Sequence, residues 1–281
     1  MNQLQLIGAL EIGLIFAVVA IGVYITFRII DFPDLTVDGS FTSGAAISVL
    51  MISFDYNPWL ASIFSGIGGA IAGSFTGYLN SRWNILGLLA GILTMTGLYS
   101  INLRIMGMPN ISIINKVTIF ENSSVITLSA LILVVIILLL TRFFASDLGL
   151  SIRGMGNNPK VSSAYGINVN KLKIITLALS NFIVALGGSL FAQSQGFADI
   201  SMGNGTVIVG LASVMIGESM LHSKKIFICL VACTIGSILY RLAITFALNA
   251  GDIGLQASDL NLITSGIVIL TMILPKLKLK V

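Results

Sequence analysis

Charged residues are the first thing that this sequence lacks. Only 9% of its 281 residues are Asp, Glu, Lys or Arg, whereas ordinary soluble domains carry about 25%. Its mean hydropathy is +1.01. A soluble fold with so few charges could not cover its surface with side chains that water solvates well. The composition therefore excludes a soluble domain and predicts a protein that crosses the lipid bilayer several times.

The residues that catalysis usually needs are also scarce. The dipeptide Gly-Lys occurs nowhere, so the chain has no P-loop with which to bind ATP. The single histidine, His222, stands beside two lysines, and no nucleophile is accompanied by a base and an orienting residue. Cys229 and Cys233 lie four residues apart, which favours small packing residues over a redox or metal site. We expect no enzyme, no metal and no cofactor.

Long apolar runs are what the sequence has instead. About 20 apolar residues cross a bilayer as a helix, and eight or nine segments approach this length. They cover residues 8–27, 39–54, 58–79, 84–103, 123–141, 174–194, 205–221, 225–248 and 260–275. Glycine recurs at every fourth position of the third segment, at Gly69, Gly73 and Gly77, which allows close helix packing. The fold we expect is an all-α transmembrane bundle, with residues 1–281 as a single domain.

Basic residues orient these spans, because cytoplasmic loops collect Lys and Arg. Residues 142–173 hold five basic residues against one acid, Asp147, so we place this segment inside the cell. Alternation then puts seven further basic residues inside and two, Arg104 and Lys116, outside. The C-terminus is thus predicted to be cytoplasmic, and the N-terminus external unless residues 39–54 form a re-entrant loop. This topology accounts for the net charge of +4 without a nucleic-acid partner.

Two short segments resemble each other. DGSFTSGAA begins at Asp38 and NGTVIVGLA at Asn204, and they lie five spans apart, so they cross the membrane in opposite directions. Inverted repeats with short helices that line the substrate path are common in transporters. We expect such a repeat here; the alternative is two ordinary short helices buried by their neighbours. The predicted path residues are Asp34, Asp38, Gly39, Ser40, Gly44, Asn204, Gly205, Thr206 and Gly210.

A polar stretch, RIIDFPDLTVD, precedes the first of these segments at residues 28–38. It holds three acids, each of which costs ~3 kcal/mol near the bilayer centre, and Pro33 interrupts the helical hydrogen bonds. It is therefore either an interfacial loop or irregular backbone that lines a polar cavity. Elsewhere the spans hold no acid at mid-depth, which weakens the case for ion-coupled transport and points to an external energy source.

The stretch GLSIRGMGNNPKVSSAYGINVNKLKI, residues 149–174, is polar and basic in an otherwise apolar chain. Its glycines indicate turns, followed by a short helix over residues 159–166. Pro159 suits the first position of that helix, Asn158 its N-cap and Gly166 its left-handed end. A surface of small side chains there suits a groove in a cytoplasmic partner. The alternative is a solvated basic loop that only sets the topology.

The order GLSIRGMGNNPKVSSAYGIN, followed by a hydrophobic span, resembles the coupling loop of ABC-importer permeases. The group it is similar to is related to branched-chain amino acid and ribose permeases. The matching residues are Gly149, Arg153, Asn158, Pro159, Gly166 and Ile167, whereas Ala164 lies two residues before the glycine and not four as in that group. RIIDFPDLTVDGSF, GSILYRL and ASDLNLIT are similar to a narrower, uncharacterised amino-acid-type subgroup. GESMLHSKK, residues 217–225, departs from the branched-chain members, which have a glycine-rich turn there.

The resemblance implies a permease subunit of the plasma (inner) membrane that forms the path for a small solute, such as an amino acid or a related metabolite. It also implies a second permease subunit, identical or paralogous, cytoplasmic ABC ATPases and an extracytoplasmic substrate-binding protein. Within a coupling loop of residues 142–173, the residues implied to contact the ATPase are Arg153, Gly154, Asn157, Asn158, Pro159, Ala164 and Gly166. The alternatives are an ion-coupled carrier or channel, and a structural membrane protein with no path.

Overall fold

A computed structural model describes residues 3–221, 223–249, 265–266 and 269. The predicted last span, residues 260–275, falls almost wholly outside these residues. The described elements follow the order α1 (Gln3–Tyr24), a π-helix η1 (Ile25–Ile29), α2 (Thr36–Ser53), α3 (Pro58–Trp83), α4 (Gly87–Met106), β1 (Asn110–Ser112), α5 (Val125–Phe144), α6 (Asp147–Asn157), α7 (Pro159–Ala164), α8 (Val169–Gln195), β2 (Phe197–Asp199), α9 (Thr206–Met220) and α10 (Ile226–Asn249).

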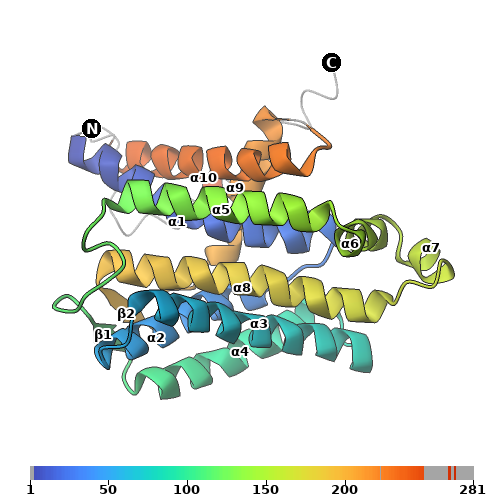
Figure 1. The fold of residues 1–281 in the computed structure, drawn as a ribbon, viewed down its shortest axis with the longest axis horizontal. Helices are drawn as coiled ribbons and strands as arrows, with labels where there is room; N and C mark the ends of the chain where they lie inside the picture. Colours follow the sequence, from blue (N-terminus) through green and yellow to red (C-terminus); the bar gives the residue numbers. More distant parts are fainter. Residues whose placement is uncertain (1–2, 222, 250–264, 267–268, 270–281) are drawn as a thin grey trace.

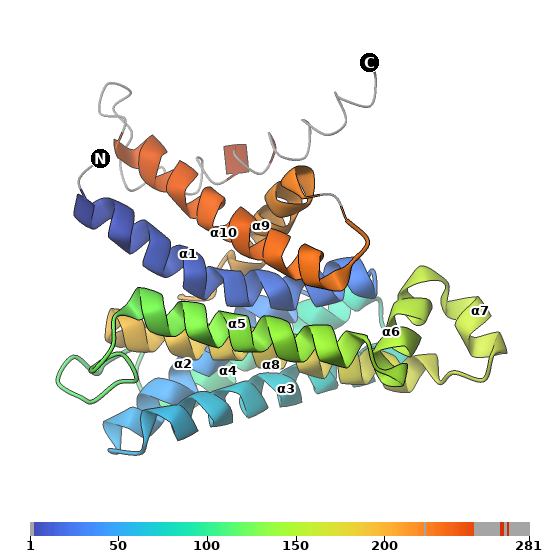
Figure 2. The same ribbon diagram turned by 45° about the horizontal axis from the view of Figure 1, so that its top comes forward.

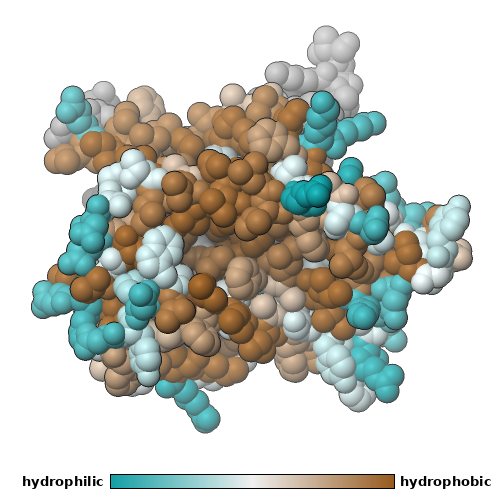
Figure 3. All heavy atoms as spheres, viewed as in Figure 1, coloured by the Kyte–Doolittle hydropathy of each residue, from teal (hydrophilic) through white to brown (hydrophobic). Residues whose placement is uncertain are grey.

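The long helices lie side by side with their axes roughly aligned (Figure 1). Six helical stretches among the described residues are long and apolar enough to cross a membrane: α1 with η1, α3, α4, α5, α8 and α10. Helix α9 has 15 residues and is roughly 22 Å long, too short to cross alone. Apolar surface forms a broad band between two ends where hydrophilic side chains gather (Figure 3). The chain is therefore an all-α, multi-pass membrane protein, as its composition predicts.

The two ends of the bundle carry different elements. Strands β1 and β2 pair antiparallel, with Asn110 opposite Asp199, and lie at one end together with the N-terminus (Figure 1). Helices α6 and α7 lie at the other end and extend beyond the long helices (Figures 1 and 2). We call these the β end and the α6 end.

Helix α8 is the centre of the bundle and packs against α1, α2 and α3. Its contact with α3 depends on the glycines spaced four apart. A Cβ atom at Gly69 would lie 2.2 Å from the carbonyl oxygen of Asn181, and one at Gly73 would lie 2.2 Å from that of Leu177. Any larger residue would separate the two helices, so the close packing predicted from the spacing is confirmed.

Helix α6 replaces the turns that the glycines of residues 149–156 indicate. The side chain of Ser146 caps the helix at the amide of Gly149, and Ile152 and Met155 are buried one turn apart. Glycine is needed at 149 because a Cβ there would lie 2.3 Å from the carbonyl oxygen of Phe143. Gly149 and Gly156 therefore serve close packing within a helix, and this prediction of turns is wrong.

Helix α7 is confirmed at the predicted place. The Asn158 side chain accepts hydrogen bonds from the backbone N–H groups of Lys160 (3.1 Å) and Val161 (3.2 Å). The helix ends at Ala164, and Gly166 has φ +82°, the left-handed conformation expected after a helix end.

Candidate functional site

The two short helices α2 and α9 meet at their N-termini. The carboxylate of Asp38, in the first turn of α2, accepts hydrogen bonds from the backbone N–H groups of Gly205 (3.0 Å) and Val207 (2.8 Å). Asp38 therefore caps α9 rather than its own helix, and its negative charge lies at the positive end of the α9 dipole. Gly205, the N-cap residue of α9, has φ +81°, which glycine adopts without steric cost. We call this contact the α2–α9 junction.

Gly203 brings the turn before α9 directly onto α2. Its backbone N–H donates to the Thr42 hydroxyl at 3.1 Å. A Cβ atom at this position would lie 2.0 Å from the carbonyl oxygen of Asp38, and backbone cannot move aside as a side chain can. Glycine is therefore required for the α2–α9 junction to close.

The chain that leads into α2 is irregular, and it alternates between exposed residues, Asp31 and Pro33, and buried ones, Phe32 and Asp34. Asp34 is fully buried, and its carboxylate accepts hydrogen bonds from the Thr36 backbone N–H (2.9 Å) and the Asn181 side-chain amide (2.8 Å). Asn181 lies near the middle of α8, so Asp34 lies near mid-depth in the bundle. Of the two alternatives for residues 28–38, the burial of Asp34 favours irregular backbone inside the protein, although Asp31 and Pro33 are exposed.

Hydroxyl groups extend this polar centre across the neighbouring helices. The hydroxyls of Thr36 and Thr76 are 2.7 Å apart, and Thr76 is 2.9 Å from the Thr94 hydroxyl. All three side chains are buried. They join α2, α3 and α4 by hydrogen bonds, which satisfies groups that would otherwise be costly to place in an apolar bundle.

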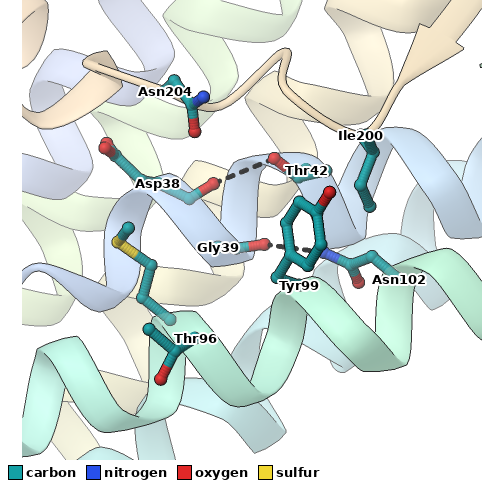
Figure 4. Close-up of a pocket in the computed structure, with 9 residues that line it drawn as sticks. Asp38, Gly39, Thr42, Thr96, Tyr99, Asn102, Ile200 and Asn204 are labelled. Carbon is teal, nitrogen blue, oxygen red and sulfur yellow. Dashed lines mark hydrogen bonds between the residues drawn. The ribbon is translucent and has the colours of Figure 1, made fainter. Parts of the chain in front are cut away.

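A cavity of about 210 Å³ opens beside the α2–α9 junction (Figure 4). Its walls come from α2, α4 and the turn before α9. The lining residues are Asp38, Gly39, Thr42, Met95, Thr96, Tyr99, Asn102, Ile200 and Asn204. At ~30 Å³ per water molecule, this volume corresponds to about seven waters. It therefore suits one small solute, and we call it the junction cavity.

The groups in the wall of the junction cavity can form hydrogen bonds to a small polar ligand. The wall offers a carboxylate, hydroxyls and side-chain amides, with Met95 and Ile200 as apolar surface. Asn102 is held in place because it accepts a hydrogen bond from the Ser43 hydroxyl (2.8 Å) and donates to the Gly39 carbonyl (3.3 Å). Within the described parts of the chain, His, Cys, Asp and Glu nowhere gather in a group of three that could hold a metal.

The predicted path residues fall into three sets. Asp38, Gly39 and Asn204 line the junction cavity. Gly205 and Thr206 form the capped start of α9, and Asp34 lies deeper, against Asn181.

The third set serves packing. A Cβ atom at Gly44 would lie 2.0 Å from the carbonyl oxygen of Ala185, and one at Gly210 would lie 2.6 Å from the Val23 side chain. Ser40 is buried. The two glycines hold helices together, and none of the three positions lines the junction cavity.

The contribution of α4 to the junction cavity is not apparent from hydropathy. Thr96, Tyr99 and Asn102 line the junction cavity, and all three belong to a helix that hydropathy marks only as a span. Their spacing of three residues places them on one helical face. That polar stripe in an apolar helix is the signal that could have found them.

The predicted coupling residues gather at the α6 end, on two consecutive helices (Figure 2). Arg153, Gly154 and Asn157 lie on α6 and are exposed. Asn158, Pro159 and Ala164 form the capped start and the last turn of α7, and Gly166 follows it. Helix α7 offers solvent an apolar surface as well, since Val161 is 49% and Tyr165 83% exposed. A small, exposed and capped helix of this kind can enter a groove in another protein.

Helix α6 rests on the segment that leads to the α2–α9 junction. A Cβ atom at Gly156 would lie 1.7 Å from the carbonyl oxygen of Ile29, the last residue of η1. In the same π-helix, Arg28 forms an ion pair with Glu218 near the end of α9. A displacement of α6 would therefore act on η1 and, through it, on both short helices.

The β end carries polar groups of a different kind. The Ser201 hydroxyl and backbone N–H donate to Asp199, and together they lower the pKa of this carboxyl group. Lys116 forms an ion pair with Asp55 at 2.6 Å. Two large apolar side chains, Ile114 (78%) and Val117 (59%), are exposed nearby.

Known proteins resemble this chain over nearly its full length. Residues 5–274 match the family described as "Branched-chain amino acid transport system / permease component". The tyrosine transport system permease protein of Clostridioides difficile is 38% identical over 265 residues, which cover 94% of this chain and 89% of that protein. The ribose import permease protein RbsC of Haemophilus influenzae is 25% identical over 284 residues, covering 98% and 82%.

A solved structure has a similar fold. PsaBC from Streptococcus pneumoniae, in complex with Fab, aligns with a TM-score of 0.56 and 13% sequence identity, covering 95% of this chain and 89% of that one.

Proposed function

Because this chain belongs to the family of permease components of branched-chain amino acid transport systems, we propose that it moves an amino acid through the junction cavity, powered by ATPase subunits that bind at its α6 end. The observation that carries this proposal is the α2–α9 junction. There a carboxylate and the start of a short helix lie beside a polar cavity, close to mid-depth in an apolar bundle.

The arrangement of α2 and α9 supports an inverted repeat. Each helix follows an irregular segment, residues 30–35 or 200–205, and each begins inside the bundle. Transporters place substrate sites where short helices from two such halves meet. The path would then pass Asp38, Gly39 and Asn204 in the cavity wall, next to Gly205 and Thr206 at the start of α9.

The substrate class follows from the cavity and from the relatives. The Asp38 carboxylate has acceptor capacity beyond its two backbone donors, and it could receive a substrate ammonium group. Tyr99, Met95 and Ile200 supply less polar surface for a side chain. The name of the tyrosine permease relative points to an aromatic amino acid, and the family description points to a branched one.

Coupling to ATP hydrolysis is assigned to α6 and α7. The exposed surface of α7, with Val161 and Tyr165, is suited to a groove of the ATPase. Arg153, Gly154 and Asn157 on α6 and Asn158, Pro159, Ala164 and Gly166 around α7 would form or shape this contact. Movement of the docked helices would reach η1 through Gly156 and switch the bundle between two states.

The orientation in the membrane and the partner subunits follow from the same proposal. We place the α6 end and the C-terminus in the cytoplasm and the β end outside, in the plasma (inner) membrane. The outer end would receive an extracytoplasmic binding protein, and a second permease subunit, identical or paralogous, would complete the path within the bilayer. Residues 1–281 would act as one permease domain with eight or nine spans.

Uptake into vesicles tests the proposal. The permease is reconstituted with the ATPase and binding protein encoded beside its gene, and radiolabelled tyrosine, leucine and ribose are compared. We expect uptake of an amino acid that requires ATP on the ATPase side and persists when ionophores collapse ion gradients. Uptake that needs an ion gradient and ignores ATP would favour the ion-coupled alternative and contradict the proposal.

A further inference from the structure

A second large cavity lies at the α6 end and shares no lining residue with the junction cavity. It has a volume of about 630 Å³ and lies between η1, α6 and the link from α9 to α10. Three basic side chains from these three elements line it: Arg28, Arg153 and Lys224. We call it the basic cavity.

The basic cavity carries positive charge that the described residues do not neutralise. Arg28 is paired with Glu218, whereas no described acidic residue forms an ion pair with Arg153 or Lys224. One of the three cations, Arg28, is thus neutralised by an ion pair, and the positive charges of the other two have no described acidic partner. Like charges that face one cavity repel, and an anion between them would remove that cost.

The remaining donors in the wall suit an oxyanion. Ser223 and Asn157 contribute a hydroxyl and a side-chain amide, and α10 begins at Ile226, so the positive end of its dipole faces the same space. Arginine forks and a lysine ammonium group together are the usual partners of phosphate. The site therefore favours a ligand with several acceptor oxygens over a single carboxylate.

Apolar surface adjoins this charged wall. Leu150 lines the cavity and is 52% exposed, and Phe227, next to the α10 start, is 48% exposed. A phosphate with an apolar attachment would satisfy both surfaces. Basic pockets between membrane helices at the cytoplasmic side bind the headgroups of anionic lipids.

We propose that the basic cavity binds a phosphate group, and that this phosphate is the headgroup of an anionic lipid of the cytoplasmic leaflet. Such a lipid would join α6 to the start of α10 and so hold the coupling segment against the α9–α10 half of the bundle. The proposal goes beyond transport, since it concerns a ligand that is not carried. It does not depend on which solute passes the junction cavity, but it rests on the proposed function for the cytoplasmic side of the α6 end. Arg153 and Asn157 of the cavity wall are also assigned above to the ATPase contact, so Lys224 is the residue that tests the lipid site alone.

Lipid titration with native mass spectrometry tests the site. The delipidated permease is titrated with phosphatidylglycerol, with phosphatidylcholine and with inorganic phosphate alone. Arg153→Gln and Lys224→Gln should each weaken phosphatidylglycerol binding roughly fivefold, because one cation near a membrane surface is worth about 1 kcal/mol. The matched control is Lys160→Gln, which removes the same charge from α7 outside the cavity, and Arg153→Lys should retain most of the binding.

Each outcome decides the proposal. Selective loss of phosphatidylglycerol in the two cavity variants supports a lipid headgroup. An equal response to inorganic phosphate supports the phosphate site but identifies free phosphate as its ligand. Equal binding in the parent, the cavity variants and the control overturns the site. Failed amino acid uptake alone leaves this result untouched.

Discussion

Asp38 is the residue on which the α2–α9 junction depends. Its carboxylate satisfies two backbone N–H groups at the start of α9, where water would otherwise be needed. We expect Asp38→Ala to destabilise the protein by about 1–3 kcal/mol, the cost of a lost cap and unsatisfied buried donors. Uptake should fall at least tenfold, because α9 loses its fixed start. Thermal unfolding and vesicle uptake measure the two effects.

Asp199→Asn at the β end is the control. An equal loss of stability and uptake in this variant would show that the effect is not specific to the junction.

Alanine substitutions at two glycines, one with no room for a Cβ atom and one with room, distinguish a steric clash from a general effect of replacing glycine. Gly203→Ala would press a Cβ against the Asp38 carbonyl at 2.0 Å, whereas a Cβ at Gly97 on α4 meets nothing within 4 Å. We expect Gly203→Ala to lower both melting temperature and uptake. Gly97→Ala should leave uptake unchanged and stabilise α4 by about 0.5–1 kcal/mol, since alanine favours helix. Similar behaviour of the two variants would show that the turn before α9 is not tightly held.

Helix α6 offers the same comparison at the scale of an element. Gly156 abuts the Ile29 carbonyl, and a Cβ there would lie 1.7 Å away, whereas a Cβ at Gly154 would meet only the Ser162 hydroxyl at 3.7 Å. We expect Gly156→Ala to move α6 off η1 and to reduce solute transported per ATP hydrolysed. Gly154→Ala should be neutral or slightly stabilising for the helix, but Gly154 belongs to the proposed ATPase contact, so Gly97→Ala on α4 is the control for the ratio. The readout is uptake and ATP hydrolysis in one preparation. A normal ratio for Gly156→Ala would contradict coupling through this contact.

The elements that the sequence predicts well are those whose causes are local. Helix α7 follows from an Asn-Pro start and a glycine end, and the close packing of α3 follows from its glycine spacing, although the spacing does not name α8 as the partner. Helix α6 was missed because its glycines look like turn residues until its neighbours Phe143 and Ile29 are known.

The junction cavity could not be predicted from any single segment, because it forms where two distant segments of the chain meet. Asp38 and Gly205 are far apart in the chain, and their pairing is a tertiary contact. The DGS and NGT repeats indicated that the two segments are related, but not that one caps the other. The polar face of α4 was not predicted, because mean hydropathy averages over all faces of a helix.

The whole molecule has two unlike ends, and its orientation is testable. In a background without Cys229 and Cys233, we expect Asp199→Cys to react with a membrane-impermeant thiol reagent added to intact cells. Lys160→Cys, at the other end of the bundle, should react only after the membrane is opened (Figure 1). The reason is the excess of basic residues at the α6 end. Labelling of Lys160→Cys in intact cells would invert the proposed topology.

A thiol placed in the wall of the junction cavity tests most directly whether solute passes through it. Asn204→Cys is introduced without the native cysteines, and the reconstituted transporter is treated with a thiol reagent while uptake is followed. If solute passes the junction cavity, modification abolishes uptake and transported substrate slows the modification. Gly97→Cys, outside the cavity lining, should keep its uptake after modification, and substrate should not change its rate of modification. Complete modification of Asn204→Cys with undiminished uptake would contradict passage through this cavity.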